Sequence, residues 1–140
     1  MTAEKRREEI RALLANAGGP ISASTLAARF SVSRQVVVGD IALLRAAGLE
    51  TPVIPGILPI QSFDSLRRVL SLCGANIPGK LYLELEAAHN EGGVEAVREA
   101  GLRFAARQIR QLLDCGAPGI HLYSLNKSEM CLRLVEEAGL

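Results

Sequence analysis

The residues best suited to chemistry in this 140-residue chain are its cysteines and histidines, and their spacing favours no catalytic or metal site. Cys73, Cys115 and Cys131 are odd in number and form no CxxC or CxxH pattern. Neither a disulfide framework nor a zinc site is therefore expected, and free thiols in a reducing compartment fit better. His121 and Tyr123 alternate along a short apolar segment, so they either face a ligand cavity or form a buried pair, and we favour the pair. We expect no catalytic residue and no metal ligand.

The charge and the apolar segments of the chain exclude some classes of protein but do not identify one. The net charge is only +1, so no field around the whole chain attracts polyanions. Residues 1–50 carry seven Lys and Arg against five Asp and Glu, and the remainder carries nine against ten. This asymmetry is compatible with DNA contact but is too small to argue for it. The charged start has no apolar signal stretch and no apolar run is long enough to span a membrane, so we expect a cytoplasmic protein without membrane contact.

Apolar periodicity predicts three short helices in residues 1–48. The first helix ends at "NAGGP", because neither glycine pairs nor proline continue a helix well. Ser22 or Ser24 caps the second helix, and Ser33 caps the third after the tight turn "SVS". Gly48 ends the third helix. A short turn between the second and third helices is typical of a helix-turn-helix unit, and the alternative is a small helical bundle without a DNA role.

The remaining residues predict strands that alternate with helices. The segment "TPVIPGILPI" is apolar and rich in β-branched residues, as a strand covered on both faces would be. Ser62 caps an amphipathic helix, Pro78 begins another, and a long helix follows over about 94–115. A short strand in "IHLYSL" and a final helix complete the order β-α-α-α-β-α. This order predicts an α/β fold, mostly helical, with two parallel strands joined by helical crossovers.

One resemblance rests on the segment "PISASTLAARFSVSRQVVVGDIALLRAAG". Over about residues 6–48 the chain resembles the DNA-binding domain of bacterial repressors related to the biotin-operon repressor, especially the nicotinate-responsive ones. The resemblance implies that Ser33, Arg34 and Gln35 start a recognition helix, where Arg and Gln donate to phosphates or to guanine and adenine. Two departures lower the expected DNA affinity. The β-hairpin wing and effector domain of that family do not follow the third helix, and Gly39 costs this helix about 1 kcal/mol relative to Ala.

A second resemblance rests on the segments "PVIPGILPIQSFDSLRR", "CGANIP" and "GIHLYSLNKSE". Over about residues 46–140 the chain resembles the C-terminal end of methylenetetrahydrofolate reductase, a flavin-dependent (β/α)8 barrel. The resemblance implies that the two strands are the seventh and eighth of such a barrel. Folate-contacting positions of the family fall on Ser65, Val69 and Lys127, where the family commonly has Gln, an aromatic residue and Arg. Lys127 keeps a cation but loses the guanidinium fork that grips a carboxylate.

The resemblance also implies where the reductase chemistry would come from. In that family the catalytic acid, the carboxylate near the flavin and most flavin-binding loops belong to earlier barrel strands, which this chain lacks. Hydride transfer needs a flavin that the protein holds in position. We therefore expect no competent reductase and no bound cofactor, with FAD as the candidate if any reductase-like binding is retained.

We expect two domains: residues 1–48 form a three-helix helix-turn-helix unit, and residues 49–140 form a two-stranded parallel quarter of a (β/α)8 barrel. The main hypothesis is a chimeric protein, of natural or engineered origin, whose only near-complete functional element binds double-stranded DNA. The alternatives are a partial flavin or folate protein and a structural product of recombination without activity. Two parallel strands leave edges that a whole barrel would cover, so we also expect self-association.

Overall fold

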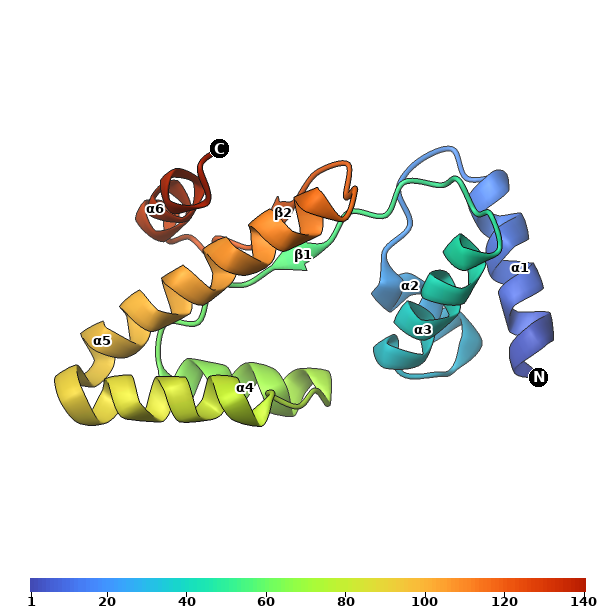
Figure 1. Ribbon diagram of the computed structural model, residues 1–140. Coiled ribbons are helices and arrows are strands. Elements are labelled where there is room, and N and C mark those ends of the chain that lie inside the picture. The colour runs from blue at the N-terminus through green and yellow to red at the C-terminus, as the bar shows by residue number, and fades with distance from the viewer. The chain divides into compact units, whose positions relative to one another are not determined.

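The computed structural model describes all 140 residues apart from the side chain of Cys73. The chain divides into two compact units, Met1–Pro52 and Val53–Leu140 (Figure 1). The first unit contains helices, and the second combines helices with two short parallel strands. In the part of the chain that is described, no helix is both long enough and apolar enough to cross a bilayer.

Three helices form the first unit, namely α1 (Ala3–Ala15), α2 (Ala23–Phe30) and α3 (Arg34–Ala46). Each helix follows a hydroxyl residue whose side chain accepts a hydrogen bond from the backbone N–H three residues later. These capping residues are Thr2, Ser22 and Ser33. The predicted caps of α2 and α3 are confirmed. The predicted tight turn between them is also confirmed, since Ser31 adopts the left-handed conformation at φ 52°.

The core of the first unit encloses a buried carboxylate. The apolar side chains of this core are Ile10, Leu26, Ala27, Phe30, Val37 and Leu44. Asp40 of α3 is 4% exposed and pairs with two guanidinium groups of α1, at 2.6 Å from Arg6 Nε and 3.4 Å from Arg7 Nη1. A buried charge is tolerated when it is paired and hydrogen-bonded, so Asp40 ties the position of α3 to that of α1.

Two strands and three helices form the second unit. Strand β1 (Gly56–Ile57) pairs in parallel with β2 (His121–Leu122). The helices are α4 (Phe63–Cys73), α5 (Gly79–Asp114) and α6 (Ser128–Ala138). The predicted parallel pairing is confirmed, and α4 and α5 lie in the connection between the two strands, as a crossover requires.

The strands are short, and proline residues confine the first of them. Pro55 and Pro59 flank β1 and have no N–H to donate to a neighbouring strand. Ile57 lies in the core beneath the sheet, but Ile54 is 60% exposed. The prediction of a strand covered on both faces is therefore wrong at Ile54.

The exposed face of the sheet carries two rings. His121 and Tyr123 make an edge-to-face contact with centroids 4.6 Å apart, so they form a pair. Both side chains are exposed, and the prediction that the pair is buried is wrong. The Tyr123 ring also lies over Gly56, where a Cβ would come within 2.5 Å of the ring carbon Cε2. The sheet is therefore covered on one side by this ring rather than by another layer of the unit.

Polar and glycine residues set the ends and bends of the helices in the second unit. Ser62 and Ser65 form a reciprocal capping box at the start of α4, which confirms the cap predicted at Ser62. Helix α5 is interrupted at Gly92 and Gly93, and Gly93 has φ 66° and ψ −147°. The predicted turn in "NEGG" is thus present as a sharp bend inside α5, and the two halves of α5 leave it in different directions (Figure 1).

Two apolar clusters stabilise the second unit. One joins β1, the second half of α5 and α6, and includes Ile57, Leu102, Ala105, Ala106, Ile109, Met130, Leu134 and Ala138. The other joins α4 to α5 and includes Leu81, Leu85, Val97 and Ala100, with Phe63 and Leu66 packed against them. Gly101 lies between these clusters, where the backbone of Ile60 approaches α5 so closely that a Cβ would overlap it.

Replacing Asp40 with Ala should destabilise the first unit by about 3 kcal/mol, because the two arginines would lose the carboxylate that pairs with them. Hydrogen exchange of the α1 and α3 amides measures this loss within that unit. The control, Glu95→Ala, removes an exposed pair with Arg98 in the second unit and should change stability by less than about 0.5 kcal/mol. Unchanged amide protection in the Asp40 variant would contradict the role of this pair.

Replacing Gly101 with Ala should destabilise the second unit by about 1–3 kcal/mol, because the added methyl group forces α5 away from Ile60. Gly39→Ala is the matched control, since a Cβ at that helical position meets no atom within 4 Å. That variant should stabilise the first unit by about 1 kcal/mol through helix propensity alone. Denaturant unfolding of both variants measures these opposite changes in the free energy of unfolding. A stabilising effect at position 101 would refute the close approach of Ile60 to α5.

Candidate functional site

The start of α3 presents polar side chains to solvent. Ser33 caps the helix by accepting a hydrogen bond from the Val36 N–H at 3.3 Å, and Arg34 and Gln35 occupy the first two helical positions. The side chains of Ser33, Arg34 and Gln35 are all exposed. The structure therefore brings the three side chains that were predicted to contact DNA to one exposed helix end.

The rest of α3 divides into a buried side and an exposed side. The buried side consists of Val37, Asp40 and Leu44. The exposed side continues from the polar start through Val38, Gly39 and Ala42. Because an α-helix turns about 100° per residue, these exposed positions share one face with Arg34 and Gln35. The exposed face of α3, residues 34, 35, 38, 39 and 42, is the candidate nucleic-acid interface.

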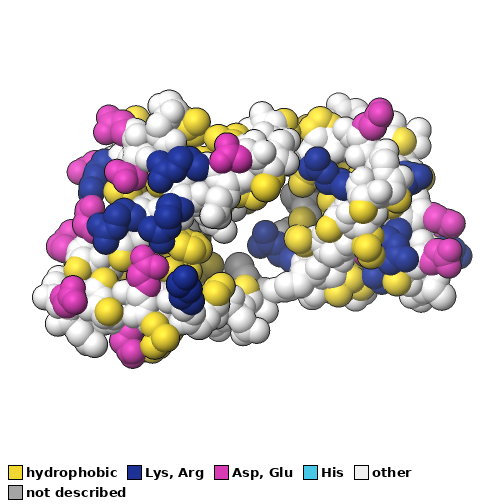
Figure 2. Space-filling view, in the orientation of Figure 1, with side chains coloured by type: hydrophobic (Ala, Val, Ile, Leu, Met, Phe, Trp, Pro, Cys, Tyr) yellow, Lys and Arg dark blue, Asp and Glu magenta, His cyan; other side chains and the backbone are white. Residues whose placement is uncertain are grey.

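Charges of both signs are interspersed on the visible surface (Figure 2). The hydrogen bond to Asp40 raises the pKa of the Arg6 guanidinium above its ordinary value, so that cation is engaged inside the first unit. The basic residues of α2 and α3 are Arg29, Arg34 and Arg45, and all are exposed. A surface of mixed sign produces little long-range field, so any DNA affinity depends on local contacts around these residues.

The three positions derived from the reductase resemblance lie on α4 and just before α6. Ser65 Oγ donates to the Ser62 carbonyl at 2.9 Å and accepts from the Ser62 N–H at 3.1 Å, so the α4 cap already uses this hydroxyl. Val69 is half-buried one turn later and has neither a polar atom nor an aromatic face. Lys127 Nζ donates to Gln61 Oε1 at 2.8 Å. These side chains do not fit a folate, because none supplies an amide, an aromatic face or a bidentate carboxylate grip.

The cations near Lys127 are paired with acidic side chains. Lys127 and Gln61 line a cavity of about 450 Å³ together with Arg98 and Arg133. Arg98 lies 2.9 Å from a carboxylate oxygen of Glu95, and Arg133 lies 2.8 Å from one of Glu99. The hydrogen bond to Glu99 raises the pKa of Arg133 above its ordinary value. Glu129 also lines the cavity, so three carboxylates balance the three cations and no concentrated positive charge is offered to an anion.

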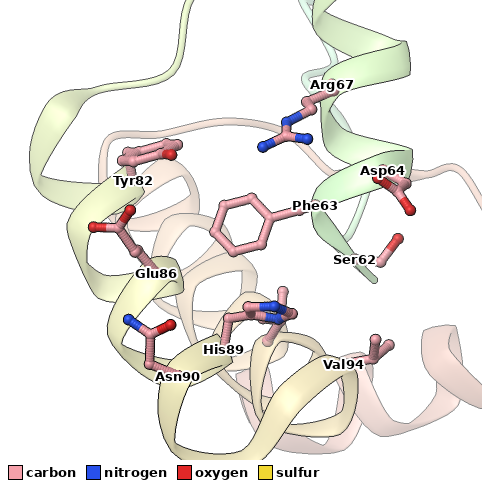
Figure 3. Close-up of a pocket in the computed structure, with 10 residues that line it drawn as sticks. Ser62, Phe63, Asp64, Arg67, Tyr82, Glu86, His89, Asn90 and Val94 are labelled. Atoms are coloured by element: carbon pink, nitrogen blue, oxygen red, sulfur yellow. The ribbon is translucent and has the colours of Figure 1, made fainter.

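A second cavity of about 350 Å³ lies between α4 and the first half of α5 (Figure 3). Phe63 projects into it, and its ring centroid lies 5.7 Å from that of Tyr82 and 5.6 Å from that of His89. The Arg67 guanidinium carbon is 6.0 Å from the same ring. No local sequence pattern predicts this cluster, because its members come from two helices that are separate in the sequence. Phe63 occupies the centre, so the cluster packs α4 on α5.

The thiols and acidic groups form no metal site in the part of the structure that is described. No group of three or more His, Cys, Asp and Glu side chains could hold a metal ion among the described residues. Cys115 and Cys131 are free thiols, and the side chain of Cys73 lies outside the described part. The candidate interface on α3 is therefore the site that the geometry supports best.

Comparison with known families finds two matches, one toward each end of the chain. The model of the HTH domain matches residues 6–62, and the model of methylenetetrahydrofolate reductase matches residues 41–139. The chain therefore carries an N-terminal helix-turn-helix domain together with a partial reductase domain. It belongs to the methylenetetrahydrofolate reductase family, whose model covers more than half of its length.

Curated relatives match the second part of the chain. Methylenetetrahydrofolate reductase (NADH) 1 of Arabidopsis thaliana is 31% identical over 69% of this chain and 16% of its own length. The probable methylenetetrahydrofolate reductase (NADPH) of Caenorhabditis elegans is 34% identical over 69% of this chain and 14% of its own length. For 5,10-methylenetetrahydrofolate reductase of Salmonella typhimurium, the identity is 28% over 67% of this chain and 31% of that protein. The chain thus spans less than a third of the curated relatives that it matches.

Proposed function

We propose that this protein binds double-stranded DNA through the exposed face of α3, and that residues 49–140 do not act as a reductase on their own. The observation that carries the proposal is the Ser33-capped start of α3, where Arg34 and Gln35 are exposed within a unit that matches a helix-turn-helix domain. In this fold the second helix of the motif enters the major groove with its N-terminal residues against the base edges.

The side chains of this interface suit distinct partners on DNA. Arg34 carries a planar fork of donors that matches either a phosphate or the O6 and N7 atoms of guanine. Gln35 has both a donor and an acceptor, as adenine requires in the major groove. Ser33 lies at the positive end of the α3 dipole, where a DNA phosphate is stabilised. Phosphate contacts would hold the helix in register, and the two longer side chains would read bases.

We propose that the second unit is the seventh and eighth strand portion of a (β/α)8 barrel, as the resemblance implied. The support is its parallel strand pair with a helical crossover and its family match. The relatives bear the name of a reductase but are far longer than the matched segment. Since Ser65, Val69 and Lys127 do not fit a folate, we assign no folate to this chain.

A titration of the full chain with a fluorescein-labelled random-sequence duplex, followed by anisotropy, tests DNA binding. We expect binding that weakens as salt rises, with a logarithmic slope of about 0.9 for each phosphate contacted. Arg34→Ala should weaken binding and reduce that slope by about 1 if Arg34 contacts a phosphate. Arg103→Ala removes the same charge from an exposed position of the second unit and should change neither quantity. Absence of binding at low salt would refute the proposal.

Ser33→Asp separates the folding role of Ser33 from its position at the interface. Aspartate caps a helix as well as serine does, so the stability of the first unit should stay within about 0.5 kcal/mol of the parent. The new negative charge would repel a phosphate, so DNA binding should weaken by about ten-fold or more at low salt. Retained stability with unchanged DNA affinity would show that the α3 start lies away from DNA.

We further propose that the second unit self-associates through apolar side chains that it leaves exposed. The support is that Leu72 is 78% exposed, Leu125 66% and Tyr123 45%, and that a two-stranded sheet leaves strand edges without a partner strand. A second copy offers the same exposed apolar side chains, and a two-fold interface is self-complementary by construction. Burial of these side chains on association would stabilise both copies.

Light scattering coupled to size-exclusion chromatography measures this association, and we expect twice the mass of one chain. The double variant Leu72→Lys and Leu125→Lys should elute as a monomer, because two charges would be buried at the contact. Leu43→Lys is the control, since Leu43 is also exposed, at 57%, but belongs to α3 in the first unit. A stable, folded monomer of the parent chain would refute self-association.

A further inference from the structure

Val38 is an apolar side chain on the exposed face of α3. It is 60% exposed, although it lies in the middle of a helix whose other side forms the core of the first unit. Exposed Val36, at 38%, and Leu43, at 57%, lie on the flanks of the helix, since they are two and five residues away from Val38. Valine contributes less to helix propensity than most residues, so α3 gains no local stability from it.

The neighbours of Val38 leave its methyl groups accessible to a flat partner. Arg34 lies one turn before it, and Gln35 lies three residues before it, so both side chains flank it on the same face. Gly39 and Ala42 complete the face with little side-chain volume, and a Cβ at Gly39 would meet no atom within 4 Å. The helix axis can thus come close to a partner surface, with Val38 as the apolar group that projects between two polar ones.

We infer that Val38 reads the 5-methyl group of a thymine in the major groove, beside the bases that Arg34 and Gln35 contact. This inference rests on the proposed DNA-binding function and adds to it the class of base that the site requires. Thymine is the base of DNA that presents a methyl group at the major-groove edge, and apolar side chains contact that methyl group. Valine has no donor or acceptor, so its contribution to specificity comes from this contact.

The expected size of the effect follows from the area of one methyl group. Burying a methyl group between valine and the base removes apolar surface of both from water. This burial should strengthen binding by about three- to five-fold relative to a base that lacks the methyl group. Uracil is such a base, because it pairs with adenine as thymine does and differs from thymine only by the absent 5-methyl group.

The experiment begins with selection of duplexes that the full chain binds from a random-sequence pool. The tightest duplex is labelled with fluorescein, and each of its thymines is replaced in turn by uracil. At one position or more we expect affinity to fall by about three- to five-fold. In Val38→Ala the same replacement should have a clearly smaller effect, because the shorter side chain covers less of the thymine methyl group, and this variant should bind the uracil duplex about as tightly as the parent does.

Leu43→Ala is the control variant, because it also shortens an exposed apolar side chain of α3 but off the interface. It should retain the full preference for thymine over uracil. Parent binding without any uracil effect, or an effect of undiminished size in Val38→Ala, would overturn the role of Val38 while leaving the DNA-binding proposal intact. Failure to select or bind any duplex at low salt would overturn both proposals. Both variants keep a helix-compatible residue at an exposed position, so loss of the fold is not expected.

Discussion

The carboxylate of Asp40 positions the helix on which the proposed function depends. It is buried on the inner side of α3, and two guanidinium groups of α1 satisfy it. On the outer side of the same helix lie Arg34 and Gln35, so one rigid element carries both the anchor and the exposed face. Arg6 and Arg7 are basic residues of a DNA-binding-like unit, yet they act within the fold. Their charges stabilise a buried anion rather than a phosphate, since buried charges need partners.

The segment that joins the two units meets the requirements of both families. The two family matches share residues 41–62, which include the second half of α3, the following loop and β1. Gly48 ends the helix with φ 86°, and the Leu49 N–H returns to the Leu44 carbonyl at 2.9 Å. This hydrogen bond satisfies a backbone carbonyl in the last turn of α3. It does so whether the next segment is the β-hairpin wing of the repressors or a barrel strand. An amphipathic helix with a glycine stop is therefore a natural place for two folds to be joined.

Features that depend on neighbouring residues were predictable from the sequence. Ser22, Ser33 and Ser62 were identified as caps because a hydroxyl before an apolar helical pattern has a local physical role. The parallel strand order followed from the alternation of strand and helix patterns. The exposed start of α3 also follows from the periodicity, since its buried positions lie on the opposite side of the helix.

Features that depend on packing between distant segments were not predictable. The partners of Asp40 are more than thirty residues away from it, so a charged residue inside an apolar stripe gave no sign of which groups pair with it. The exposure of His121 and Tyr123 depends on what covers the sheet, and strand alternation alone carries no such information. The hydrogen bond from Lys127 to Gln61 joins residues 66 positions apart, and it forms only when β1 and β2 pair.

The bend at Gly93 limits which residues can occupy this corner of the second unit. Its combination of φ 66° and ψ −147° is open to glycine and costs any residue with a Cβ strain in the backbone. The first half of α5 reaches α4 only because the chain reverses there (Figure 1). Any other residue at position 93 would therefore strain the corner on which the packing of the first half of α5 against α4 depends.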